Sequence, residues 1–267
     1  MKKLGAFLAG VGLLASATFA ADSNTATSVN VVGFSAQDLP PSGKLVLVGV
    51  PFKTVGGGST TLMDLFGTNQ LRNAAFYTSA DRVLLWDNVA GTYRYFAIRS
   101  SDMQFHNAQS STTWGQAATN PVVTAGMGLW IWAPSSASAT NRINVSGEVI
   151  SETNKSVNIY QGLNLLSHLF SCDLDVNNSD LTNSQAVAAA FYTSADRLYV
   201  WDSVAQTYHI WGFRLSDRKW HYADNSTQWG QGPVTNKIPA GEGFWYRRLT
   251  NSVMTWTENN PYSENLK

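Results

Sequence analysis

A histidine stands four residues after an aspartate at two places in the chain, Asp102 to His106 and Asp217 to His221. A carboxylate that orients an imidazole can make it a general base, and the same pair is half of a zinc site. Zinc needs three or four ligands, and the sequence has no histidine or cysteine pair at ligand spacing. We therefore expect structural hydrogen bonds here, and neither a metal nor a cofactor.

Two tryptophans lie in polar segments, each two residues before a glutamine. An indole ring stacks on the C–H face of a sugar, and nearby amides can bind the sugar hydroxyls. The alternative is that the fold buries these rings. The candidate ligand-binding residues are Trp114, Gln116, Trp229, Gln231, His106 and His221.

These features come in pairs because the chain contains an internal repeat. Shifted by 115 positions, residues 76–132 align without a gap with residues 191–247, and 27 of the 57 aligned pairs are identical. Average composition gives roughly 6% identity by chance, so the segment is duplicated. Trp86 and Trp130, which lie in apolar runs, recur as Trp201 and Trp245, and a core position is expected for all four.

Acidic residues do not indicate an enzyme. Glycoside hydrolysis needs two carboxylates, one of them desolvated, but none of the five glutamates recurs in the repeat, and Met127 occupies the position of Glu242. Oxygen donors alternate in the acidic run 173–180, which makes Asp173, Asp175 and Asn177 a weak calcium candidate. That run lacks the turn glycine and the bidentate glutamate of a calcium loop, and a polar loop with a helix cap explains it equally well.

Short strands dominate the expected secondary structure. Apolar runs between turn residues predict about eight strands per repeat, among them 28–34, 44–52, 82–87, 92–98, 126–132 and 142–149. Threonine caps and a stopping glycine predict one short helix over 60–67. We therefore expect an all-β protein with two similar tandem β-sandwich or small-barrel domains, each with one short helix.

The expected domains span 28–150 and 151–258, divided by a polar stretch at 151–156 and followed by a C-terminal tail at 259–267. The strand at 28–34 has no clear counterpart at the start of the second repeat. Strand exchange between the repeats, with 143–149 serving both, therefore stays open.

The N-terminus predicts export. Lys2 and Lys3 precede an apolar run and a small-residue stretch, which is the order of a signal peptide over 1–20 cleaved after Ala20, with a flexible segment at 21–27. No later segment is apolar enough to span a membrane. The sole cysteine, Cys172, cannot form an intramolecular disulfide, and a small buried side chain is the favoured interpretation over a reactive thiol.

The charge balance argues against nucleic acid as a partner. Without the signal peptide, 16 basic residues face 18 acidic ones and no basic run occurs, whereas binding phosphates needs clustered lysine and arginine.

Several motifs occur in a recognisable order: Asn30-Val31-Val32-Gly33-Phe34, the Trp-Asp hairpins, Gly-x-Gly-x-Trp, and Gly147-Glu148-Val149 before the second copy. In this order the chain resembles uncharacterised secreted tandem-repeat β proteins of planctomycete- and verrucomicrobia-type bacteria. The resemblance implies an extracytoplasmic β-rich protein and no particular activity.

Together these features predict a secreted, non-enzymatic structural or surface-interaction protein of the cell envelope or extracellular matrix. It would assemble with copies of itself through quasi-equivalent repeat faces. The alternative is a bivalent carbohydrate-binding protein that uses its loop tryptophans on an envelope or matrix polysaccharide. A glycoside hydrolase is a distant third.

Overall fold

Two five-stranded antiparallel sheets with the same strand order form the centre of the molecule. The first central sheet has the order β2 (Leu45–Gly49), β9 (Gly128–Trp132), β5 (Arg82–Asp87), β6 (Thr92–Arg99), β7 (Gln104–Asn107). The second has the order β12 (Gly162–Ser167), β16 (Gly243–Arg248), β13 (Arg197–Asp202), β14 (Thr207–Arg214), β15 (Lys219–Tyr222). The sequence repeat therefore corresponds to a repeat of topology.

The computed structural model describes residues 31–88, 90–108, 114–118, 121–223, 229–230 and 232–262. The predicted signal peptide (1–20), the segment 21–27 and the last five residues of the tail 259–267 lie outside this range.

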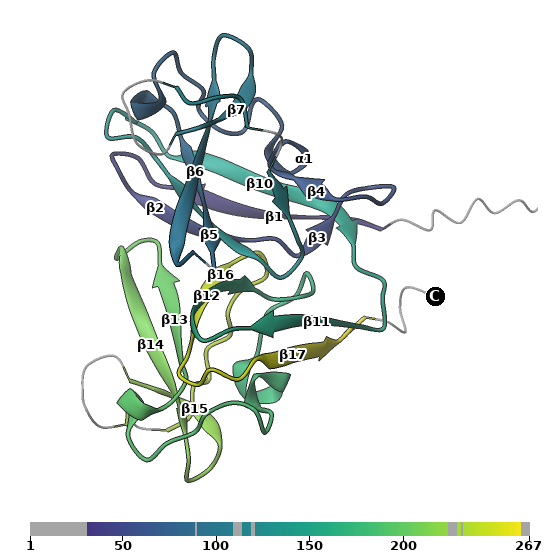
Figure 1. Ribbon diagram of the computed structural model, residues 1–267, viewed down its shortest axis with the longest axis vertical. Helices are drawn as coiled ribbons and strands as arrows, with labels where there is room; N and C mark the ends of the chain where they lie inside the picture. The colour runs from purple at the N-terminus through teal and green to yellow at the C-terminus, as the bar shows by residue number, and fades with distance from the viewer. Residues whose placement is uncertain are drawn as a thin grey trace, which may run out of the picture.

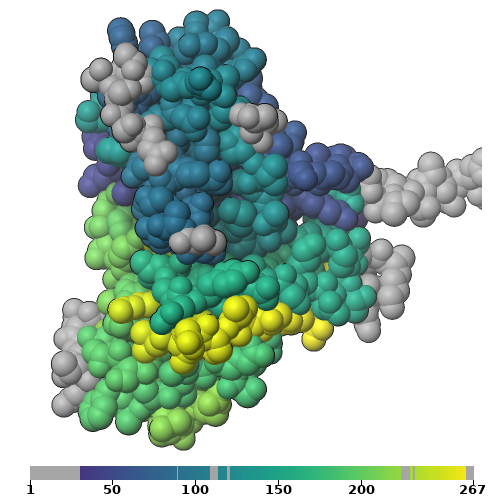
Figure 2. Space-filling model, in the orientation of Figure 1, coloured from purple at the N-terminus to yellow at the C-terminus, as the bar shows by residue number. Residues whose placement is uncertain are grey.

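A smaller sheet covers one face of each central sheet. Before residue 150, β1 (Val32–Leu39) pairs with β10 (Asn141–Val149), which also pairs with β3 (Phe52–Lys53). After it, β11 (Asn154–Ile159) pairs with β17 (Met254–Asn259), and these two lie side by side in Figures 1 and 2. The short strands β4 (Thr60–Thr61) and β8 (Val122–Val123) form a further pair. Within the described residues no sheet closes on itself, so the layers are sandwich-like rather than barrels.

β11 is the counterpart of β1 that the sequence did not reveal. It starts at Asn154, inside the stretch expected to be a linker, and its polar, half-exposed residues hide the strand pattern. Among the described strands, β10 pairs only with β1 and β3. Strands are therefore not exchanged between the repeats.

Each pair of layers encloses its own hydrophobic core. Phe52 and Val145 from the covering sheet pack with Val83 and Ile131 from the first central sheet. Trp256 from β17 packs with Trp211 and Phe244 from the second.

The predicted helix at 60–67 forms as α1 (Leu62–Phe66), with Thr61 and Asp64 bonded in a capping box. An α-helix in the second repeat was also expected, and this expectation is wrong for the described residues. The 3₁₀ turns η2 (Val176–Asn178) and η3 (Asp180–Thr182) occur there instead. The side chains of Asp175 and Ser179 accept backbone N–H groups two residues on, which closes tight turns in place of a continuing helix.

Candidate functional site

Aromatic side chains fill the space between the two central sheets, and we call this cluster the seam. Strand alternation sends Val83 and Leu85 of β5 into the first core and Leu84 and Trp86 to the other face. Each central sheet is thus covered on both faces. The seam consists of Leu45, Leu47, Leu84, Trp86, Tyr93, Tyr95, Trp130, Trp132, Leu165, Tyr199, Trp201, Tyr208 and Trp245.

The repeated tryptophans meet across the seam in reciprocal pairs. Trp86 lies edge-to-face with Trp245, with ring centroids 5.1 Å apart and planes at 87°. Trp130 and Trp201, the equivalent residues with the repeats exchanged, lie 5.0 Å apart at 89°. Such pairs add stability beyond the burial of their area. The four strand tryptophans therefore pack between the repeats rather than inside either repeat's own core.

Hydrogen bonds across the seam are reciprocal too. The Trp86 indole N–H donates to the Leu163 carbonyl at 2.8 Å, and that of Trp201 donates to the Leu45 carbonyl at 3.3 Å. Leu45 pairs with Trp132, and Leu163 pairs with Arg247. Trp132 and Arg247 are related by the 115-residue shift, so Leu45 and Leu163 are equivalent positions.

The backbone repeats this pattern where the last residues of β2 and β12 meet the turns before β16 and β9 of the other repeat. The Gly49 N–H donates to the Gly241 carbonyl and the Ser167 N–H donates to the Gly126 carbonyl, both at 2.8 Å. A Cβ atom at Gly128 would lie 2.7 Å from the Leu166 carbonyl oxygen, so glycine permits the close approach of the two repeats here. The two repeats therefore pack with approximate twofold symmetry, as subunits do in an isologous dimer.

One residue breaks this symmetry. The Gln206 carboxamide donates to the Leu45 carbonyl at 2.9 Å and accepts the Leu45 N–H at 3.0 Å. Its counterpart is Gly91, with a similar backbone (φ 62° against 53°) but no side chain. A Cβ atom at Gly91 would meet nothing within 4 Å. One side of the seam is therefore plugged, and the other is not.

A cavity of about 590 Å³ opens on the unplugged side, and we call it the open slot. Leu163 is 39% exposed there. The Tyr208 hydroxyl accepts the Trp245 indole N–H at 3.1 Å, which fixes both rings. Apolar rings, hydroxyls and one guanidinium thus converge on a recess open to solvent. The residues that line the open slot are Trp86, Gly162, Leu163, Tyr199, Tyr208, Trp245 and Arg247.

The loop tryptophans are held by their own repeat. The indole N–H groups of Trp114 and Trp229 donate to the carbonyls of Ala75 and Ala190, each at 2.6 Å. Both rings are half-buried, so neither is the fully exposed platform that the carbohydrate hypothesis assumed. Gln116 is exposed, and Gln231 lies outside the described residues.

The two Asp-His hydrogen bonds form as expected, and the histidine of each pair is buried. His106 bonds Asp102 through Nε2 at 3.0 Å and the Gly115 carbonyl through Nδ1 at 2.9 Å. His221 bonds Asp217 at 3.0 Å. The rings are 2% and 0% exposed, so neither meets a solvent-borne ligand in this conformation.

An arginine completes each pair. Arg99 contacts Asp102, and Arg214 binds Asp217 through two hydrogen bonds of 2.7 and 3.1 Å. The arginine bonds, followed by the histidine bonds, hold the pKa of each aspartate well below its usual range. Structural hydrogen bonding therefore describes these clusters.

A second cavity, of about 460 Å³, contains Glu242, the carboxyl that stands where the first repeat has Met127. Burial, followed by the charges of Asp173 and Asp202, raises the pKa of Glu242 to about 7. Trp201 and His209 also line this cavity. Asp202 closes the neighbouring hairpin by accepting the N–H groups of residues 204 and 205, both at 2.8 Å. Glu242 is thus partly protonated at neutral pH. The difference between Met127 and Glu242 in the aligned repeats was the signal in the sequence.

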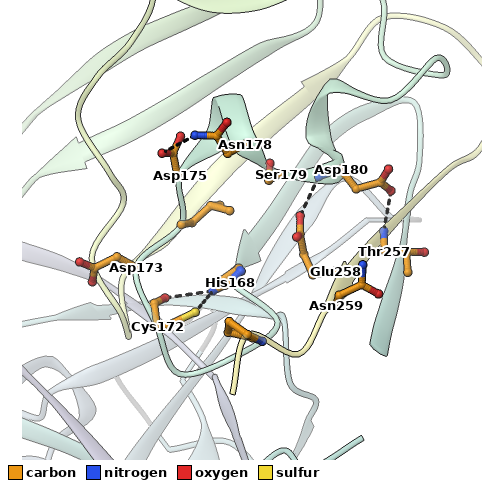
Figure 3. A pocket seen from close by; sticks show the side chains of 12 residues that line it. His168, Cys172, Asp173, Asp175, Asn178, Ser179, Asp180, Thr257, Glu258 and Asn259 are labelled. Atoms are coloured by element: carbon orange, nitrogen blue, oxygen red, sulfur yellow. Dashed lines mark hydrogen bonds between the residues drawn. The ribbon is translucent and has the colours of Figure 1, made fainter. Parts of the chain in front are cut away.

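A third cavity is lined by acidic residues between β17 and the turns after β12 (Figure 3). Cys172 Sγ lies 3.2 Å from His168 Nδ1, a spacing that suits a nucleophile and its base. Burial and the charge of Asp173, however, raise the pKa of the Cys172 thiol to about 11, so it stays protonated at neutral pH.

The calcium candidates Asp173, Asp175 and Asn177 do not converge. Asn177 binds the backbone of Trp220 and Val234, whereas Asp175 binds the turn that follows it. Within the residues that the structure describes, no three histidine, cysteine, aspartate or glutamate side chains are grouped to hold a metal ion.

The chain matches no known protein family, no curated protein and no solved structure. No helix in the described part of the chain has the length and apolarity to cross a membrane.

Proposed function

We propose that the protein is a non-enzymatic carbohydrate-binding protein that acts outside the cytoplasm. In this proposal two tandem β-sandwich domains are joined at the seam, and the ligand is an envelope or matrix polysaccharide. The observation that carries the proposal is the open slot, where the rings of Trp86, Tyr199 and Tyr208 lie next to Arg247. Aromatic faces stack on sugar C–H groups, and hydroxyls and guanidinium N–H groups bind sugar oxygens.

The proposal moves the binding site from the polar loops to the seam. The indole N–H groups of the loop tryptophans donate to backbone carbonyls of their own repeats, and Trp114 packs against the buried His106. One open slot per chain also replaces the two equivalent loop sites that the sequence suggested.

The test compares slot and loop variants on a polysaccharide array and by pull-down with insoluble polysaccharides. Tyr199→Leu together with Arg247→Ala removes two slot contacts, and leucine already occupies the equivalent place at Leu84. We expect this variant to lose at least tenfold in affinity, whereas Trp114→Ala together with Trp229→Ala keeps its binding. The reverse result would return the site to the loops, and no binding by the wild type would refute the proposed function.

Self-assembly is the second candidate, favoured by two equivalent exposed rings. Phe76 and Phe191 are 66% and 67% exposed at matching places in the repeats. Large exposed apolar side chains at matching sites suit contacts between copies of the chain. Analytical ultracentrifugation of the mature chain is expected to show concentration-dependent association that Phe76→Ser with Phe191→Ser abolishes. A strictly monomeric wild type at all concentrations would contradict this candidate.

A further inference from the structure

The plugged side of the seam shows what kind of group the open slot is built to hold. The Gln206 carboxamide binds both main-chain groups of Leu45. Its Oε1 accepts the Leu45 N–H, and its Nε2 donates to the Leu45 carbonyl. The Leu45 carbonyl accepts the Trp201 indole N–H as well, so one oxygen receives two donors.

The same main-chain edge is presented at Leu163. Its carbonyl accepts the Trp86 indole N–H, as the equivalent carbonyl of Leu45 accepts that of Trp201. In an extended strand the N–H and C=O of one residue point to the same side, so the Leu163 N–H faces the slot with its carbonyl. Because position 91 is glycine, the first repeat has no side chain at the position from which Gln206 reaches Leu45.

We infer that the open slot binds a vicinal pair of sugar hydroxyls at Leu163, in the place that the Gln206 carboxamide takes at Leu45. This inference rests on the proposed function and names the recognised group. Two neighbouring hydroxyls offer a donor and an acceptor at about the spacing of a carboxamide. One accepts the Leu163 N–H, the other donates to the Leu163 carbonyl, and the sugar ring lies against the slot aromatics.

A secondary acetamido group fits this edge less well. Its N–H and C=O point in opposite directions in the trans form, so it cannot engage both groups of one residue. A primary carboxamide, such as a glutamine side chain of a peptide, has the required pair and is the other source of this chemistry. The test therefore includes a peptide probe.

The sharpest variant is Gly91→Gln, which gives the first repeat the residue of the second. The side chain enters open space, and Gln206 already adopts the same left-handed backbone. We expect Gly91→Gln to plug the slot. Gln206→Gly should open a second, weaker slot at Leu45, where Leu84 and Trp132 stand in place of Tyr199 and Arg247. Gly91→Asn is the matched control: asparagine tolerates this backbone but is too short to fill the place of the glutamine.

Isothermal titration calorimetry of the full mature chain with cellohexaose, 2,3-di-O-methylated cellohexaose and a glutamine-containing tripeptide tests the inference. We expect one cellohexaose per wild-type chain, at least tenfold weaker binding by Gly91→Gln, and unchanged binding by Gly91→Asn. Gln206→Gly should add a second site of lower affinity. The methylated sugar and the tripeptide should not bind.

Unchanged affinity in folded Gly91→Gln, or equal binding of the methylated sugar, would overturn this inference and leave the proposed function standing. Binding of the tripeptide alone would assign the slot to peptide carboxamides and also overturn it. If no polysaccharide on the array and neither hexasaccharide bound the wild type, the proposed function itself would fail.

Discussion

Glu242 is half-buried, and its carboxyl keeps its proton up to about neutral pH because burial and the charges of Asp173 and Asp202 raise its pKa to about 7. The unfolded chain releases that proton near pH 4.5. Between these values the folded state binds more protons than the unfolded state, so the free energy of unfolding falls as the pH rises. The full effect is on the order of 3 kcal/mol, lost between pH 4.5 and about 7.5.

We predict that Glu242→Gln removes this decline. Urea unfolding from pH 4.5 to 8 measures the free energy of unfolding of wild type and variant. The difference between the two values should widen in favour of the variant as the pH rises. Glu242→Met is the matched control, because methionine stands at the equivalent position 127. A constant difference across this range would contradict the assigned proton.

Asp196 is fully buried with Arg248, and their side chains meet at 3.3 Å. Asp196 also accepts the Tyr246 hydroxyl and the backbone N–H groups of Val187 and Leu249. Tyr246, Arg248 and Leu249 lie 50, 52 and 53 residues from Asp196 in the sequence, so this carboxylate ties distant segments of the second repeat together.

We predict that Arg248→Met destabilises the protein by about 3–5 kcal/mol, because it leaves a buried carboxylate without its cation. Arg142→Met breaks the exposed pair with Asp38 and should cost less than about 1 kcal/mol. Urea unfolding at pH 7 measures both. If both substitutions lowered the free energy of unfolding equally, burial would not determine how much each ion pair contributes to stability.

Single positions were the hardest feature to predict. Alignment of the repeat exposed Met127 against Glu242, and Gly91 against Gln206, but such differences are also what neutral drift produces. Only the fold brings Gln206 to Leu45, 161 residues away, and shows what its absence at Gly91 opens. The sequence therefore shows that positions 91 and 206 differ, but it does not show that Gln206 contacts Leu45.

Strand alternation is more informative at the scale of elements. The predicted strands 82–87 and 92–98 match β5 and β6 closely, because aromatic and β-branched residues alternate between two faces. Of the four strand tryptophans expected in the core, Trp130 and Trp245 are buried, whereas Trp86 and Trp201 are half-buried. Periodicity alone did not show that their partners belong to the other repeat, since it gives the face of a strand but not what covers it.

Tryptophan pairing across the seam predicts energetic coupling. In a double-mutant cycle, Trp86→Leu and Trp245→Leu should show an interaction of about 0.5–1.5 kcal/mol, because their rings meet edge-to-face. Trp86→Leu combined with Trp229→Leu is the control, since Trp229 bonds its own repeat, and these effects should add. Chemical unfolding gives the free energy of unfolding of every single and double variant. If the effects of Trp86→Leu and Trp245→Leu simply added, the result would contradict a seam that joins the repeats.

At the scale of the whole molecule, the all-β class and the repeat followed from the sequence, whereas the relation between the repeats did not. The reciprocal bonds at Leu45 and Leu163 show that the repeats face each other as two subunits would. Because the two repeats are parts of one chain, a residue in one repeat can change while the equivalent residue in the other stays the same. Gly91 and Gln206 are such a pair of positions, and their difference leaves one open slot in a nearly symmetric molecule.

The decisive measurement is a crystal structure of residues 21–267 soaked with cellohexaose. We predict one saccharide per chain in the open slot, with its ring against Trp86 and Tyr199 and two neighbouring hydroxyls on the N–H and C=O of Leu163. A saccharide bound at the Trp114 and Trp229 loops or beside Glu242, with the slot empty, would contradict it.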